Sequence, residues 1–120
     1  STTATAFDGD EIDNAANVTT VASATAAASG TAQIATAGKL ATFNAADNTL
    51  ALKVTAVEAA IAGAGNADGA SAIFADSGNT YIFISEGSAG VGAGDALIEL
   101  TGFDATGKTL LANAADGFIA

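Results

Sequence analysis

Four acidic side chains near the start of the chain form its densest group of residues able to do chemistry. They are Asp8, Asp10, Glu11 and Asp13. Carboxylate oxygens are the ligands that Ca²⁺ prefers, and the D-x-D spacing is the one that opens an EF-hand loop. Ile12 stands where the third ligand belongs, and that loop's central Gly and distant Glu are missing. The sequence therefore predicts a calcium site at Asp8, Asp10 and Asp13, with the acidic first turn of a helix as the alternative.

The remaining composition excludes most enzyme chemistry. The chain has no Cys and no His, which excludes disulfides, the common zinc sites and His-dependent catalytic triads. The three Lys residues show no Ser-x-x-Lys spacing, so we expect no enzyme activity. A net charge of −10 repels nucleic acid and anionic lipid. That excess of acid suits surroundings rich in divalent cations, or serves solubility alone.

A glycine-rich stretch, Gly87–Glu99, admits three interpretations. A phosphate-binding loop would need a helix after the glycines and a Lys, and neither is present. Gly90, Asp95 and Leu97 match the calcium-binding nonapeptide of β-roll proteins, but Val91 and Ala93 stand where its glycines belong and only one copy occurs. We interpret the stretch as a loop that joins two antiparallel strands.

Three β-rich runs organise the second half of the chain. They are Ser71–Asp76, Thr80–Glu86 and Asp95–Thr101. The polar residues Ser77-Gly78-Asn79 supply a hairpin turn between the first two, with Gly78 and Asn79 able to take positive φ. The second run is apolar on both faces, which places it at the centre of a sheet, whereas the third alternates between a covered and a solvent-facing side.

The clearest helix is Ala45–Gly63. Asp47 or Asn48 is placed to cap it, and one apolar stripe runs along it. The stripe consists of Leu50, Val54, Val57 and Ile61. A stripe of this kind must pack against a sheet.

The first half of the chain gives weaker signals. Thr31–Thr36 and Lys39–Asn44 predict a hairpin, Asn17–Ser29 has the spacing of a helix ending at Gly30, and Ser1–Phe7 alternates like an extended arm. We therefore predict a single α+β domain over residues 1–120. We expect residues 31–120 to form an antiparallel sheet of about five strands with one main helix on one face, and residues 1–30 to form the arm and the second helix.

The core predicted from this composition is light, because most of the hydrophobic residues are Ala, with six Phe and one Tyr. We expect help from ions or neighbouring subunits. Open sheet edges are templates for strand addition, so we predict that the arm pairs with an adjacent subunit; a frayed terminus or a strand of its own sheet is the alternative. The arm residues assigned to assembly are Thr2, Ala4, Ala6 and Phe7. No stretch approaches the length of a membrane helix.

Several of these segments together resemble a known family. They are Val57-Glu58-Ala59-Ala60, Gly78–Ser85, Gly87 with Ala89–Ala93, and Asp95 with Leu97–Gly102. This arrangement is similar to the C-terminal, bluetail-like domain of type I-secreted bacterial surface proteins, which include S-layer proteins and RTX-type adhesins. The stretch Asp116–Ala120 resembles the signal for that export route. The resemblance implies export through an ABC-type channel, extracellular calcium and assembly at the cell surface.

The residues and the resemblance together predict a secreted structural protein of the bacterial cell surface. We expect it to self-assemble into an extracellular filament or layer with the aid of calcium. The alternative is a calcium-dependent adhesion or binding module that ends a larger secreted protein. The size of the particles that the purified chain forms in solution distinguishes these two functions, because only the structural subunit should polymerise alone.

Overall fold

The fold consists of one α-helix and two β-sheets, as described for residues 11–13, 19–65, 68–113 and 116–119 by a computed structural model. The helix is α1 (Leu50–Gly63). One sheet contains β2 (Thr19–Thr20), β3 (Ala70–Asp76), β4 (Asn79–Ile84) and β5 (Ala96–Leu100), in that order. The other has the order β1 (Glu11–Asp13), β7 (Asp116–Ile119), β6 (Leu110–Asn113). The α+β class predicted from the sequence is confirmed.

The three predicted β-rich runs form β3, β4 and β5. β4 pairs antiparallel with both neighbours, so the run that is apolar on both faces does lie inside the sheet. The hairpin turn differs by one residue from the prediction. Ser77 and Gly78 take the positive φ angles, 51° and 83°, and Asn79 already begins β4. Two such residues in succession match the right-handed twist of the strands that they join.

The helix predicted over Asn17–Ser29 is wrong where this segment is described; Asn17 and Val18 lie outside the described residues. β2 occupies its start and pairs in parallel with Ala70 and Ser71. Ser23 exchanges backbone hydrogen bonds of 2.9 and 2.8 Å with Ile34. β-Branched Thr and Val residues disfavour a helix, and these distant partners satisfy the backbone instead.

The predicted hairpin over residues 31–44 is also wrong in detail. Its two halves meet at Gln33 and Thr42 through two backbone hydrogen bonds of 2.9 Å, but no continuous strand forms. The other backbone groups bind elsewhere: the amide of Ala32 donates to the carbonyl of Ala56 in α1 at 2.9 Å, and that of Ala41 to Ile73 at 2.8 Å. The main sheet therefore has four strands and is mixed, because β2 runs parallel to β3, instead of the five antiparallel strands predicted.

α1 packs as its apolar stripe predicts, since Val54, Val57 and Ile61 are buried. Its N-cap is not Asp47 or Asn48 but Thr49, whose hydroxyl accepts a hydrogen bond of 3.2 Å from the amide of Leu52. Asp47 is buried and binds the amide of Gly30 at 2.9 Å, so it fastens the preceding loop. No helix in the described residues is long and apolar enough to cross a membrane.

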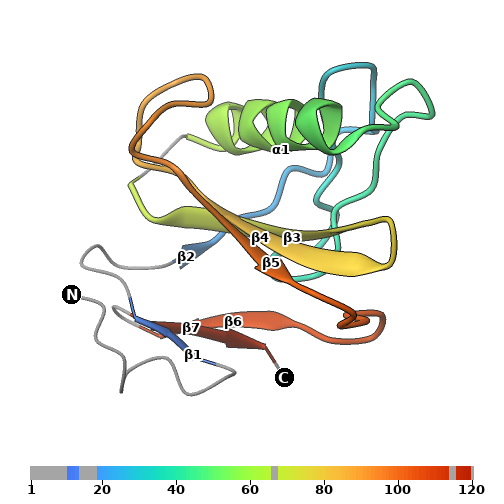
Figure 1. Cartoon of the computed structure of the whole chain (residues 1–120). Coiled ribbons are helices and arrows are strands. Elements are labelled where there is room, and N and C mark those ends of the chain that lie inside the picture. The colour runs from blue at the N-terminus through green and yellow to red at the C-terminus, as the bar shows by residue number, and fades with distance from the viewer. Residues whose placement is uncertain (1–10, 14–18, 66–67, 114–115, 120) are drawn as a thin grey trace.

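The elements form three layers (Figure 1). α1 lies on one face of the four-stranded sheet and the three-stranded sheet lies beneath the other face. Phe74, Phe83 and Tyr81 fill the core on the helix side, where Phe74 stacks on Tyr81 with ring centroids 5.4 Å apart. Ile73, Ile82 and Leu110 belong to the core on the opposite side.

Gly38 connects the segment that precedes α1 to β6 of the three-stranded sheet. Its carbonyl accepts a hydrogen bond of 2.7 Å from the amide of Leu110 in β6. A Cβ atom at this position would collide with the carbonyl oxygen of Leu110, and the φ of Gly38 is +84°. Only glycine combines that conformation with so close an approach.

Candidate functional site

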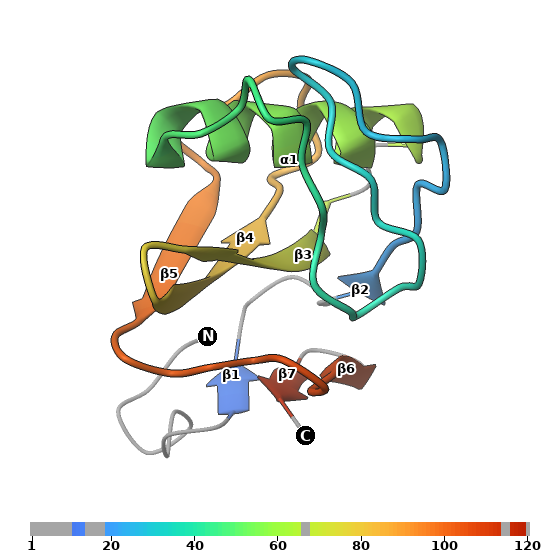
Figure 2. The ribbon, with the colours of Figure 1, turned by 90° about the vertical axis from the view of Figure 1, so that its right-hand side faces the viewer.

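The outer edge of β5 is the feature of the described structure best suited to binding another chain. β5 is the last strand of the four-stranded sheet, and all of its residues pair with β4, from Ala96 opposite Ile84 to Leu100 opposite Thr80. No described segment pairs with its other side. Figure 2 shows β5 at the rim of the sheet, at the opposite end from β2. Its outward N–H and C=O groups are therefore available to a further strand, except that the carbonyl of Leu100 accepts a hydrogen bond of 3.2 Å from the amide of Phe103.

The other sheet edges are shorter or covered. β2 has only two residues. Further along the same side of β3, Leu40 forms a parallel bridge with Ile73, and the amide of Ala41 donates a hydrogen bond to the carbonyl of Ile73. The outer side of β6 is engaged at Leu110 by the hydrogen bond to Gly38. β1 is three residues long, and two of the three carry a carboxylate. A sheet edge is usually protected from further pairing by a short strand or by charged side chains. β5 has five residues and a single charge, so it is less protected than β1 or β2.

The side chains of β5 divide between its two faces as the alternating sequence predicts. Ala96, Ile98 and Leu100 pack against the core on the side of β6. Leu97 is 43% exposed although its cross-strand partner Phe83 is only 1% exposed. Both helix-side residues of β5, Leu97 and Glu99, are exposed, whereas α1 packs on the neighbouring strands β3 and β4. A large apolar side chain thus lies beside an open edge.

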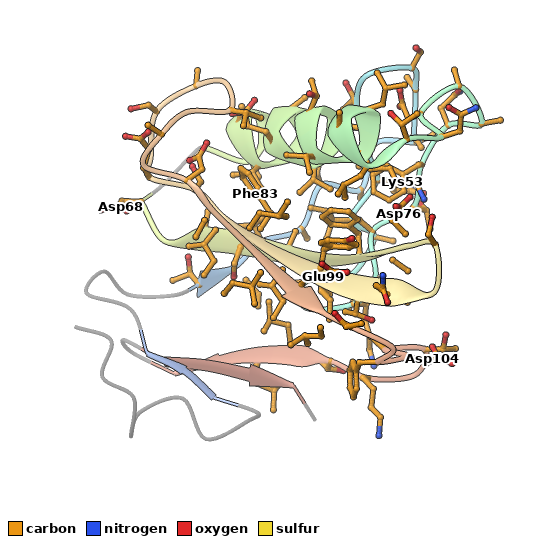
Figure 3. The ribbon with its side chains drawn as sticks, in the orientation of Figure 1. Lys53, Asp68, Asp76, Phe83, Glu99 and Asp104 are labelled. Atoms are coloured by element: carbon orange, nitrogen blue, oxygen red, sulfur yellow. The ribbon has the colours of Figure 1, made fainter. Side chains whose placement is uncertain are left out.

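Glu99, labelled in Figure 3, is the only charged residue of β5. The side-chain amide of Asn79, which begins the neighbouring strand β4, donates a hydrogen bond of 2.9 Å to its carboxylate. Glu99 also lies opposite Tyr81 in the strand pairing. Burial, followed by the charge of Glu99, raises the pKa of Tyr81 above its usual value of 10.0.

The glycine-rich loop between β4 and β5 is fastened by carboxylates. Asp95 accepts hydrogen bonds from the amides of Glu86 at 2.8 Å and Gly92 at 2.7 Å. Glu58 of α1 reaches the amide of Gly90 at 2.8 Å. The loop joins antiparallel strands, as we interpreted it, and its acidic groups serve its own backbone. Sequence reasoning gave Glu58 no role, although an acidic residue beside the apolar stripe of a helix is a signal for one.

The predicted site residues fall largely beyond the described ranges. Asp8 and Asp10 lie outside the described residues, and so do Thr2, Ala4, Ala6 and Phe7. Asp13 is in β1, where its position opposes Asp116 of β7, and Asp116 in turn opposes Asn113 of β6. The register therefore brings two acidic positions and one Asn into a row across the three strands. Within the described residues, no cluster of three acidic, His or Cys side chains is arranged to hold a metal ion.

Comparison with known proteins leaves the family of this chain open. No protein-family model, no curated protein and no solved structure matches it significantly. The similarity to surface-protein domains therefore rests on the sequence segments given above.

Proposed function

We propose that this protein is a secreted, non-enzymatic structural subunit of the bacterial cell surface that associates with copies of itself into an extracellular filament or layer. The observation that carries the proposal is the open edge of β5 beside the exposed side chain of Leu97. An edge of this kind offers a row of unpaired backbone groups to another strand, and strand addition is a common way for proteins to associate.

The composition of the core supports the same proposal. Six of the residues buried in the helix-side core are alanines: Ala32, Ala41, Ala56, Ala60, Ala70 and Ala72. Alanine side chains bury little apolar area, and each Å² removed from water contributes only about 25 cal/mol. Contacts with neighbouring subunits would add buried area that the isolated domain lacks.

Calcium is proposed as an aid to assembly, and the strand register supports it. Asp13 and Asp116 hold directly opposed positions in β1 and β7. Like charges at opposed positions destabilise a strand pair, and a bound divalent cation would relieve that repulsion. Asp8 and Asp10, only a few residues before β1, would supply further oxygen ligands.

The amino-terminal arm is proposed as a link between subunits. Thr2, Ala4, Ala6 and Phe7 belong to a stretch that carries no charged side chain in a protein of net charge −10. Such a segment can approach a second copy without adding to the repulsion between them. We propose that it pairs with an adjacent subunit and that Phe7 fills an apolar gap there.

Replacing the arm tests this function. In one variant Ser1–Phe7 is deleted, and in a control the same residues are exchanged for a Gly-Ser segment of equal length. We expect both variants to lose polymers in negative-stain images while keeping the circular dichroism and cooperative melting of the parent. Polymers that still form from both variants would rule out the arm as the link.

A further inference from the structure

We propose that β5 of one copy pairs antiparallel with β5 of a second copy about a two-fold axis at Ile98, so that two sheets become one continuous sheet. The inference rests on the proposed function, because it names the surface through which two subunits first associate. It commits the open edge to a second copy of this chain.

The edge itself is regular enough to be extended. Each residue from Ala96 to Leu100 pairs one to one with β4, so the strand has no bulge. The strand also lacks Pro and Lys, the residues that most often protect an edge. Its backbone is therefore a ready template for a partner of the same length.

Full overlap of the two five-residue strands and their charges together select one register of self-pairing. Residues that oppose one another share a face of the sheet, so the two-fold axis must pass through a residue position. An axis at Glu99 would set the two Glu99 carboxylates against each other, and an axis at Leu97 would set Glu99 against Asp95. With the axis at Ile98, Glu99 opposes Leu97 of the partner and no acidic residues are directly opposed.

The same register suits both faces of the joined sheet. On the side of β6, Ile98 opposes its own copy at the axis, which pairs two β-branched apolar residues and extends the core that Ile98 already contacts. On the helix side, the partner strand lies next to Leu97, whose exposed fraction is 43% in the single chain. Glu99 stays bound to Asn79 of its own chain at 2.9 Å.

A two-fold contact of this kind closes on itself and produces a dimer, not a filament. Growth into a polymer then depends on a second contact, which the proposed function assigns to the arm. Since each chain carries a charge of −10, repulsion opposes the dimer, and added salt should lower its dissociation constant.

Charge substitutions test the register in the full-length chain by sedimentation velocity over a dilution series. Leu97→Glu adds a carboxylate opposite Glu99 of the partner twice per dimer, and should raise the dimer dissociation constant at least roughly tenfold. Adding Glu99→Lys to Leu97→Glu places opposite charges across the axis and should restore dimerisation. Leu52→Glu is the matched control, since Leu52 is also 43% exposed but lies on α1, and it should leave the dimer unchanged.

A cross-link tests the axis independently. The chain has no Cys, so Ile98→Cys introduces a single thiol that can pair only with another copy. Directly opposed residues of antiparallel strands have Cα atoms about 4.5 to 5.5 Å apart, which suits a disulfide. Mild oxidation should cross-link Ile98→Cys much faster than the more exposed control Leu52→Cys.

The outcomes separate the two proposals. Unchanged dimerisation of Leu97→Glu, failure of Glu99→Lys to restore it, or equally fast cross-linking of both Cys variants would overturn the β5 pairing. If the parent still forms polymers in that case, the proposed function stands. A parent chain that remains monomeric at every concentration would overturn both.

Discussion

The side chain of Asn79 links the two ends of the edge hairpin, because its amide nitrogen donates to the carboxylate of Glu99 at 2.9 Å while its amide oxygen accepts from the backbone of Gly102 at 2.8 Å. Asn79 begins β4, Glu99 lies in β5 and Gly102 follows β5. The side chain of Asn79 therefore holds in place both the Glu99 carboxylate of β5 and the turn that follows this strand.

Asn79→Ala removes both of these hydrogen bonds. We expect the free energy of unfolding to fall by about 1 to 2 kcal/mol, the usual net contribution of such bonds when one joins a charged group. Chemical denaturation measures the change. Asn48→Ala, at an exposed position just before α1, is the control and should shift stability by less than about 0.5 kcal/mol. Equal stabilities of the two variants would contradict the role given to Asn79.

Val57 tests the packing of α1 on the sheet. This side chain is 0% exposed, so Val57→Asp would bury a carboxylate without a partner, at a cost of several kcal/mol, a large share of the stability of a small domain. We expect the variant to lose cooperative melting in circular dichroism. Leu52→Asp, on the exposed side of the same helix, should melt like the parent. A Val57→Asp melt within about 5 °C of the parent would show that α1 does not pack this way.

The sequence predicted the parts of the fold in which the hydrophobic pattern and the turn residues agree. β3, β4 and α1 are long, strongly patterned and bounded by turn residues, and the structure contains all three. The segment over residues 17–44 was misjudged because it is rich in Ala and Thr, which carry little periodic signal. Its backbone partners, such as Ala56 and Ile73, are distant in sequence and leave no local trace.

The candidate site shows the same division. Alternation along β5 predicted that Leu97 and Glu99 face away from the core on the side of β6, but it gave no sign that they stay exposed on the face that carries α1. That fact depends on the position of the helix across the sheet, which local sequence does not specify. Sequence reasoning also missed the hydrogen bond between Glu58 and Gly90, because it likewise joins residues far apart in the chain.

Tyr81 should make stability fall at alkaline pH. Its folded-state pKa lies above the usual value of 10.0, chiefly through burial and then the charge of Glu99. The unfolded chain would therefore ionise first, so this contribution is complete below about pH 10 and is lost as the pH rises through the folded-state pKa. Tyr81→Phe should show a smaller alkaline loss in thermal melts. Since the chain has one Tyr, its ionisation can be followed directly by ultraviolet absorbance. A midpoint at or below 10 would contradict the raised pKa.

Calcium should raise the melting temperature or promote assembly, because opposed acidic positions such as Asp13 and Asp116 gain a shared counter-ion. NaCl at the same ionic strength should favour the dimer by screening alone, but it should raise the melting temperature and the particle size less than calcium does, since screening is not ligation. Asp116→Asn should reduce the response to calcium. Identical melting and particle size in EDTA and in millimolar CaCl₂ would leave the acidic residues as solubility charge only.

The most direct test of self-association is the mass of the purified chain in solution as a function of concentration. The monomer has a mass of 11.4 kDa. Sedimentation equilibrium should give a weight-average mass that rises from this value towards twice it and beyond as concentration and salt increase. A mass that stays at 11.4 kDa over the whole range, with and without calcium, would contradict the account and favour a monomeric binding module.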